Sequence, residues 1–199
     1  MDYSLIVNKN NLLNATFVPD NLKEYSEYNG IKIDPNHKTL VEEETLNSFF
    51  EMKKAAIQNG YNIVIDSAYR SYEYQQTVLN KYLELKGEEA YSFVALPGSS
   101  EHQTGLAIDI ALSRNGEYID EFDDTFPEIA WVHQNAYKFG FILRYPKGKE
   151  EITGFKYEPW HFRFVGKKLA YQMHCEDIGS LEEYHLLKKK EVKKISQTK

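Results

Sequence analysis

Apolar residues alternate with small or polar residues between positions 106 and 112. The apolar set is Leu106, Ile108, Ile110 and Leu112, and the other set is Ala107, Asp109 and Ala111. Because successive side chains of a strand point to opposite faces, this pattern predicts a strand with one buried apolar face. Asp109 then lies between two alanines on the opposite face, with space beside it. A buried aspartate satisfied by hydrogen bonds and a ligand for an ion both account for this arrangement.

The remaining hydrophobic pattern predicts helices and strands in a mixed order. Helical periodicity with capping residues and terminal glycines predicts helices over residues 41–59, 71–86, 125–139, 167–175 and from 180 onward. Ser71 is expected to cap the second of these, and capping boxes are expected at Thr125 and Ser180. Alternating segments predict further strands over residues 61–67, 141–145, 152–156 and 162–165. This order indicates an α+β fold, in which helices pack on a mainly antiparallel sheet.

Less regular segments join or flank these elements. Residues 1–40 are rich in Asn and Asp and are expected to form an extended arm with one or two short strands. Residues 113–124 contain Asn115-Gly116 and several acids, which predicts a solvated turn and loop. No repeat and no Pro/Gly/Ser-rich linker divides the chain, so residues 1–199 are expected to form a single domain.

The charge is unevenly distributed along the chain. The net charge of the whole chain is −6, but residues 188–199 carry six Lys and one Glu. The remaining acidic body argues against nucleic acid as a partner. The basic tail is expected to be a solvated, frayed end. The sequence does not indicate an oligomeric state.

Cysteine content and hydropathy bear on the compartment. Cys175 is the only cysteine, so no intrachain disulfide forms. The start of the chain lacks a signal-peptide pattern, and no stretch of apolar residues reaches transmembrane length. As written, the sequence predicts a cytoplasmic protein, although an extracellular ectodomain whose leader had been removed would look the same.

Candidate chemistry gathers around three residues. His102 and Asp109 are seven residues apart, and His161 follows about fifty residues later in Glu158-Pro159-Trp160-His161. Two imidazoles and one carboxylate with an open fourth position form a typical catalytic zinc arrangement. Pro159 excludes a helix here, so this is not the helical His-Glu-x-x-His pattern.

Two further residues could complete a hydrolase. Glu158 is placed to accept a proton from water, and Arg70, in Asp66-Ser67-Ala68-Tyr69-Arg70-Ser71, could stabilise an oxyanion or a substrate carboxylate. Taken alone, Glu158 is equally well explained as a loop carboxylate, and Arg70 is equally well explained as a partner in a surface ion pair. From residue types and spacing alone, only a possible metal site follows.

Two separated motifs give the chain a family resemblance. The pattern Ser-x-His-x-x-Gly-x-Ala-x-Asp is met by Ser100, His102, Gly105, Ala107 and Asp109, and Glu-x-x-His is met by Glu158 and His161. With these motifs the chain resembles the zinc D-alanyl-D-alanine carboxypeptidases of the VanY type, including the bifunctional D,D-dipeptidase/D,D-carboxypeptidases of vancomycin resistance. The similarity runs from about residue 7 to about residue 184. Ala68 stands where many relatives have Gly.

This resemblance implies specific roles for residues of the chain. It implies one Zn²⁺ held by His102, Asp109 and His161 on the sheet, with Glu158 as general base and Arg70 as a substrate or transition-state contact. It also implies that Ser100 and Gln75 line the site. For Ser100, a turn residue bonded to local backbone is an equal alternative. Tyr145 and Trp160 are candidates for shaping the pocket, although aromatic packing also accounts for them.

The implied activity is removal of the terminal D-alanine from peptidoglycan precursor peptides that end in D-Ala-D-Ala. Whether free D-Ala-D-Ala is also cleaved is left open. An L,D-carboxypeptidase or a peptidoglycan endopeptidase of the endolysin kind would fit the same scaffold. A non-catalytic zinc-binding module is the remaining alternative, but it would be expected to lack Glu158.

Overall fold

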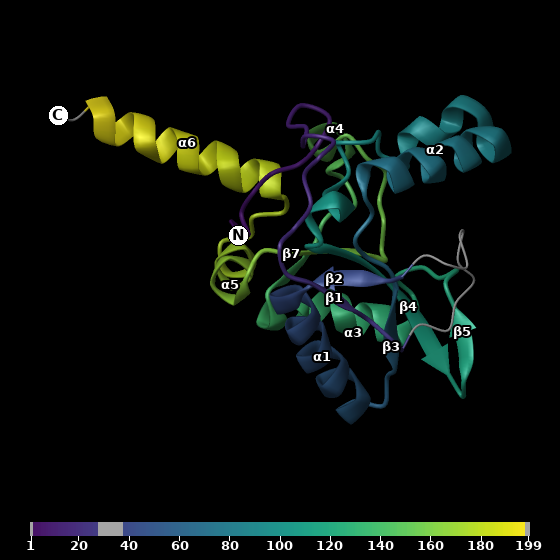
Figure 1. Cartoon of the computed structure of the whole chain (residues 1–199). Coiled ribbons are helices and arrows are strands. Elements are labelled where there is room, and N and C mark those ends of the chain that lie inside the picture. Colours follow the sequence, from purple (N-terminus) through teal and green to yellow (C-terminus); the bar gives the residue numbers. More distant parts are fainter. Residues whose placement is uncertain (1, 28–37, 198–199) are drawn as a thin grey trace.

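The computed structural model describes residues 2–27 and 38–197 (Figure 1). The strands are β1 (Leu22–Glu24), β2 (Leu40–Glu42), β3 (Ile63–Ser67), β4 (Ala107–Arg114), β5 (Glu117–Ile119), β6 (Phe141–Leu143) and β7 (His161–Phe164). The helices are α1 (Glu43–Gln58), α2 (Tyr72–Lys86), α3 (Pro127–Asn135), α4 (Glu150–Thr153), α5 (Lys167–Cys175) and α6 (Leu181–Gln197). Short 3₁₀ turns span Gly87–Ser92, Glu101–Thr104 and Ala136–Phe139.

A five-stranded sheet forms the centre of the fold. Its strand order is β3-β4-β7-β6, with β5 also paired to β4, and every paired neighbour is antiparallel. A separate ribbon is formed by β1 and β2. The α+β class with a mainly antiparallel sheet is therefore confirmed.

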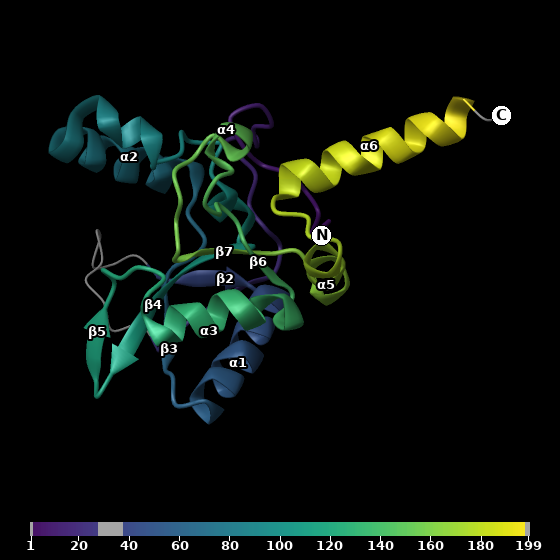
Figure 2. The same ribbon diagram turned by 180° about the vertical axis from the view of Figure 1, so that it is seen from behind.

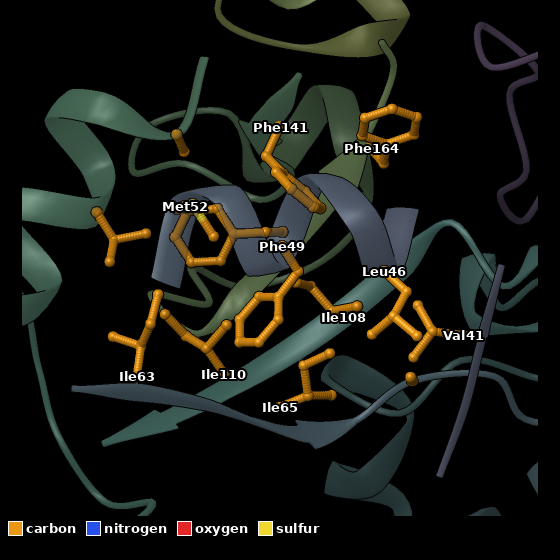
Figure 3. Packing of buried hydrophobic residues seen from close by; sticks show 14 of the residues in the cluster. Val41, Leu46, Phe49, Met52, Ile63, Ile65, Ile108, Ile110, Phe141 and Phe164 are labelled. Atoms are coloured by element: carbon orange, nitrogen blue, oxygen red, sulfur yellow. The ribbon is translucent and has the colours of Figure 1, made fainter. Parts of the chain in front are cut away.

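One face of this sheet is covered by α1 and α3 (Figures 1 and 2). Figure 3 shows Phe49 and Met52 of α1 above the isoleucines of β3 and β4. The predicted apolar positions Leu106, Ile108, Ile110 and Leu112 all belong to this core and are almost fully buried. The opposite set of β4, which contains Asp109, therefore faces away from the core, as the alternation predicts.

The helix boundaries follow local capping chemistry. Ser71 caps α2 as predicted, since its hydroxyl accepts a hydrogen bond from the Tyr74 backbone N–H at 3.1 Å. Ser180 likewise accepts from the Glu183 backbone N–H at the start of α6. The capping box at Thr125 is wrong: α3 begins at Pro127 with Phe126 as its N-cap and no side-chain cap. Thr125 instead bonds to Asp123 through its N–H and hydroxyl, which closes a local turn before the helix.

Two predicted segments differ in the structure. The strand expected over residues 152–156 is replaced by α4 and a turn, because Ile152 and Thr153 donate to the Lys149 carbonyl and Gly154 ends the turn with φ 79°. Ile152 is 42% exposed, so its apolar side chain has no sheet to face. The loop expected over residues 113–124 contains a hairpin, in which β4 runs to Arg114 and turns at Asn115-Gly116 into β5. Both turn residues have positive φ, as a tight two-residue hairpin requires.

The chain ends also differ in part from expectation. The arm over residues 1–40 holds β1 and the first residue of β2, although positions 1 and 28–37 of that prediction lie outside the described residues. The basic segment 188–199, expected to fray, is helical to Gln197 within α6, and positions 198–199 lie outside the described part. Lys and Glu favour helix, and Lys188 pairs with Glu191 one turn away. Figures 1 and 2 show α6 extending away from the body. Within the described ranges, no helix has the length and apolarity to cross a membrane.

Candidate metal centre and active site

Two candidate ligands lie directly opposite each other on neighbouring strands. Asp109 of β4 pairs with His161 of β7 in the antiparallel register. Because Ile108 and Phe162 beside them point into the core, Asp109 and His161 both project from the other face of the sheet. The register of the sheet therefore places a carboxylate and an imidazole side by side.

The third candidate ligand, His102, comes from the 3₁₀ turn before β4. Its ring is fixed from behind, since Nδ1 lies 2.6 Å from the Ala68 carbonyl oxygen. The Arg70 backbone N–H donates to the His102 carbonyl at 3.2 Å, which ties this turn to the segment after β3. The ring nitrogen that remains, Nε2, points towards Asp109.

The three side chains form a compact donor set. His102 Nε2 lies 3.3 Å from Asp109 Oδ2, and His161 Nδ1 lies 2.9 Å from Asp109 Oδ1. One ligand atom from each of the three residues can be chosen so that all lie within 4.8 Å of one another. Zinc bonds of about 2.0–2.2 Å place tetrahedral ligand atoms roughly 3.3 Å apart. The buried His102 Nε2 has no hydrogen-bond partner among the described residues, so this donor set fits a divalent cation.

The electrostatics of the cluster favour positive charge between these groups. Burial and the charge of Arg70 lower the pKa of His102 to about 4, so this imidazole is neutral and available as a ligand. Burial also disfavours protonated His161, but the hydrogen bond to Asp109 and the nearby negative charges of Glu101 and Glu158 outweigh it and raise the pKa of His161 to about 9. In Asp109, burial is outweighed by the two histidines, which hold the pKa of its carboxyl well below the usual range. A site that retains a proton so tightly would also attract a metal cation.

Glu158 stands beside the donor set without belonging to it. Its Oε2 lies 3.7 Å from His161 Nδ1, and its backbone N–H donates to the Tyr145 carbonyl at 3.1 Å. The His161 N–H donates back to the Glu158 carbonyl, so the Pro159-Trp160 turn holds both residues in place. Burial raises the pKa of the Glu158 carboxyl to about 7, a value suited to proton transfer near neutral pH.

The remaining predicted site residues line one pocket together with the donor set. This pocket is bordered by Arg70, Gln75, Ser100, Tyr145, Glu158 and Trp160, with walls from Tyr82, Phe93, Val94 and Phe155. Arg70 Nη2 lies 3.4 Å from Asp109 Oδ2, while its buried Nε makes no hydrogen bond within the described chain. Gln75 donates to the Ala95 carbonyl at 2.8 Å and leaves Oε1 buried and unpaired among the described residues. Tyr145 packs its ring 4.8 Å from that of His161.

A second hollow continues from this pocket. It shares Tyr82, Asp109 and Trp160 with the pocket and is bordered by residues 120–122 of the loop that follows β5. This loop therefore lies beside the pocket.

Sequence reasoning missed the charged groups beneath the site. Glu101 Oε1 accepts hydrogen bonds from Arg144 Nε and Arg163 Nη1, both at 2.8 Å, and all three side chains are fully buried. Arg144 also forms a two-bond pair with Glu182 at the start of α6. The available signal was an arginine within an apolar strand, as in Phe162-Arg163-Phe164, which places a cation on the face opposite the core.

Comparison with known proteins places this geometry in a family. The family model VanY, described as D-alanyl-D-alanine carboxypeptidase, matches residues 38–167, a range that contains every predicted site residue. The chain belongs to the VanY family. It is therefore a member of a peptidase family, and the resemblance seen in the two sequence motifs is confirmed.

Individual relatives match most of the length of the chain. A protein of Bacillus subtilis (strain 168), named putative carboxypeptidase YodJ, is 42% identical over 195 residues, which are 96% of this chain and 68% of that protein. The structure of the LdcB LD-carboxypeptidase matches with a TM-score of 0.76 at 41% identity, covering 90% of this chain and 84% of that one.

A second solved structure bears on the metal. The vancomycin resistance D,D-pentapeptidase VanY from the VanB-type resistance cassette, in complex with Zn(II), matches with a TM-score of 0.76 at 30% identity. The match covers 92% of this chain and 99% of that one. A family member of the same fold thus binds zinc, and this chain has a donor set that fits it.

Proposed function

We propose that this protein is a zinc-dependent D,D-carboxypeptidase that removes the terminal D-alanine from peptidoglycan precursor peptides ending in D-Ala-D-Ala. The observation that carries the proposal is the buried cluster of His102, Asp109 and His161, with Glu158 beside it in a pocket. Membership of the VanY family supports the substrate class. The presence of Glu158 argues against a non-catalytic zinc module.

The proposed division of labour follows the geometry. His102, Asp109 and His161 would hold one Zn²⁺, which would supply Lewis-acid activation of water and of the scissile carbonyl. Glu158 accepts the proton that water loses on attacking the carbonyl carbon and then delivers it to the amine of the leaving D-alanine. Its buried carboxyl, with a pKa raised to about 7, exchanges a proton readily in both steps.

Substrate binding is assigned to the polar groups that lack partners. Arg70 lies next to Asp109 with a free buried N–H, so it can bind the developing oxyanion or the terminal carboxylate of the peptide. Gln75 offers its unpaired oxygen, and Ser100 its hydroxyl, to the peptide backbone. Tyr145 and Trp160 form part of the wall around the leaving residue.

An L,D-carboxypeptidase activity is the second candidate. The observation that favours it is the higher identity to the LdcB LD-carboxypeptidase, 41%, than to the D,D-pentapeptidase VanY, 30%. The two activities differ in the residue that precedes the released D-alanine, so they differ in what the inner part of the pocket accepts.

One set of assays tests the proposal. The purified protein is analysed for metal and then offered a muramyl pentapeptide ending in D-Ala-D-Ala, the corresponding tetrapeptide, and free D-Ala-D-Ala. We expect D-alanine release from the pentapeptide, loss of that release with a chelator, and recovery on adding Zn²⁺. Release from the tetrapeptide alone would favour the L,D activity, and internal cleavage without free D-alanine would favour an endopeptidase. Zinc binding without cleavage of any of these peptides would overturn the enzymatic assignment.

A further inference from the structure

Glu101 is a buried carboxylate beside the donor set. It is neither a candidate metal ligand nor the proposed base. It begins the 3₁₀ turn Glu101–Thr104 and immediately precedes the candidate ligand His102. Its two oxygens have different surroundings. Oε1 accepts hydrogen bonds from Arg144 and Arg163, whereas Oε2 is buried without a hydrogen-bond partner in the described chain.

The unpaired oxygen of Glu101 faces an unpaired nitrogen. Glu101 Oε2 lies 3.9 Å from His161 Nε2, which is also buried and makes no hydrogen bond to a described residue. A buried donor and a buried acceptor that are left unpaired destabilise the fold. Their separation is about 1 Å longer than a hydrogen bond, so a small movement of either side chain would pair them.

The choice of ring nitrogen explains why such an interaction matters. His161 Nδ1 faces Asp109 and Glu158, so Nδ1 is the nitrogen available to a metal. A neutral imidazole carries its proton on one nitrogen only, and Nδ1 can bind a metal only if that proton is on Nε2. Nε2–H then needs an acceptor behind the ring.

The other histidine shows the same arrangement with a different acceptor. His102 presents Nε2 towards Asp109, and its Nδ1 lies 2.6 Å from the Ala68 carbonyl oxygen. A backbone carbonyl therefore sets the tautomer of His102. For His161 the atom in the equivalent position is a carboxylate oxygen of Glu101.

We propose that Glu101 is a positioning residue of the metal site, whose Oε2 accepts the Nε2–H of His161 and so presents Nδ1 as the ligand. Carboxylate–histidine–metal relays of this kind fix ring orientation and raise ligand basicity. The two arginines on Oε1 hold the carboxylate in place, so Oε2 is left for His161. This inference rests on the proposed zinc site.

The decisive variant is Glu101→Gln. The amide oxygen must take the Oε1 position, because Arg144 and Arg163 can only donate there. The amide NH₂ then faces His161 Nε2 and donates to it, which stabilises the tautomer with the proton on Nδ1. This change therefore opposes metal binding directly, beyond the loss of a charge.

Glu182→Gln is the matched control. It makes the same chemical change next to the same arginine, since Glu182 pairs with Arg144 at 2.7 and 2.8 Å. The atoms that Glu182 contacts belong to Arg144 and Asn8, not to either histidine. Both variants weaken the buried ionic cluster, but only Glu101→Gln reverses the hydrogen bond to His161.

Zinc affinity is measured by competition with a chromophoric chelator, and unfolding of the metal-free proteins is measured in parallel. We expect Glu101→Gln to lower zinc affinity by about 10- to 100-fold. Glu182→Gln should leave affinity unchanged even if it lowers stability. Equal zinc affinity in wild type and Glu101→Gln would overturn the positioning role. If the wild type itself binds no zinc, the proposed function fails instead.

A spectroscopic measurement on the wild type covers the case in which Glu101→Gln does not fold. In the zinc-loaded protein with ¹⁵N-labelled histidine, the ring Nε2–H of His161 should give a downfield proton signal that exchanges slowly with water. Glu182→Gln should retain this signal. A His161 ring that shows a metal-bound Nε2, or a rapidly exchanging Nε2–H, would contradict the proposal.

Discussion

Two buried polar regions share the face of the sheet opposite the main core, and they differ in how completely their groups are paired. In the cluster formed by Arg144, Arg163 and Glu182, no buried side-chain nitrogen or oxygen lacks a hydrogen bond within the described chain. In the adjoining pocket, unpaired atoms remain on Arg70, Gln75, His102 and His161. Glu101 belongs to both, with one oxygen in each region.

This difference distinguishes the fully paired cluster, which supports the fold, from the pocket, which is the candidate site. Among the described residues, six buried side-chain atoms lack a hydrogen-bond partner, and all except that of Gln103 belong to residues that line the pocket. Unpaired buried groups are destabilising, so their concentration at one place indicates partners supplied from outside the chain. Complete pairing, by contrast, indicates a rigid support beneath the ligands.

The largest effect is expected for Glu158→Gln. The amide keeps the shape of the side chain but cannot accept the proton from water, so the turnover rate for the pentapeptide should fall by about 10²- to 10⁴-fold. Because Glu158 is outside the donor set, zinc content should be unchanged. A variant that hydrolyses at the wild-type rate would remove Glu158 from the mechanism.

Arg163→Met tests the fully paired region. It removes a buried donor to Glu101 and leaves the Tyr3 and Leu5 carbonyls without its hydrogen bonds. Removing one partner of a buried ion pair typically costs about 3–5 kcal/mol. We expect a decrease of this size in the free energy of unfolding. Urea unfolding monitored by circular dichroism measures it.

The matched control for Arg163→Met is Lys167→Met, in an ion pair with Glu51. Both partners are more than half exposed, with side-chain exposures of 55% and 56%. The expected change in the free energy of unfolding is below about 1 kcal/mol. Equal effects of the two variants would contradict the distinction between a supporting buried cluster and ordinary surface pairs.

Arg70→Gln tests the unpaired region. The side chain loses the charge that faces the reacting centre, so kcat/KM should fall by about 10²- to 10³-fold, the range found for loss of an oxyanion donor. Stability should change less than in Arg163→Met, since the Arg70 guanidinium makes one long contact, to Asp109 at 3.4 Å, and has a buried N–H without a partner in the described chain. A large loss of stability with normal kcat/KM would show that Arg70 belongs to the scaffold.

The smallest effect concerns pH and His133, a residue of α3 outside both polar regions. Burial lowers the pKa of His133 below its ordinary value, although its Nε2 lies 3.0 Å from the Pro159 carbonyl oxygen. The folded state therefore binds fewer protons than the unfolded state, and stability is lost as pH falls below about 6.5, the usual histidine pKa. Titration of His133 should change the free energy of unfolding by at most about 1.4 kcal/mol per pH unit.

The variant His133→Gln should flatten this part of the stability profile. Urea unfolding of wild type and variant between pH 5 and 8 measures the difference. An unchanged profile would show that His133 does not contribute to the pH dependence.

The sequence predicts the parts of the molecule that depend on local pattern. The alternation around Asp109, the Ser71 cap and the helix over residues 167–175 each follow from neighbouring residues, and the structure confirms them. The donor set was predicted from two motifs, and the structure brings its members together. Their roles in catalysis stay predictions.

The sequence predictions fail where residues far away in the sequence determine the local structure. Residues 152–156 alternate like a strand but have no neighbouring strand, so local hydrogen bonds form a helical turn instead. No role was predicted for Glu101, which stands between the motif residues Ser100 and His102. Its partners are 43 and 62 residues away, so only the folded sheet shows that it is buried against two arginines.

The pairing of Asp109 with His161 has a consequence for how the protein could be monitored. Side chains alternate along β4 and β7, so a slip of one residue in either strand would turn a ligand into the core and an isoleucine or phenylalanine out of it. The candidate metal site and the core thus depend on the same alignment of two strands. If the proposed zinc site is correct, the zinc bound per chain in a preparation of this protein would count the molecules whose strands are correctly aligned.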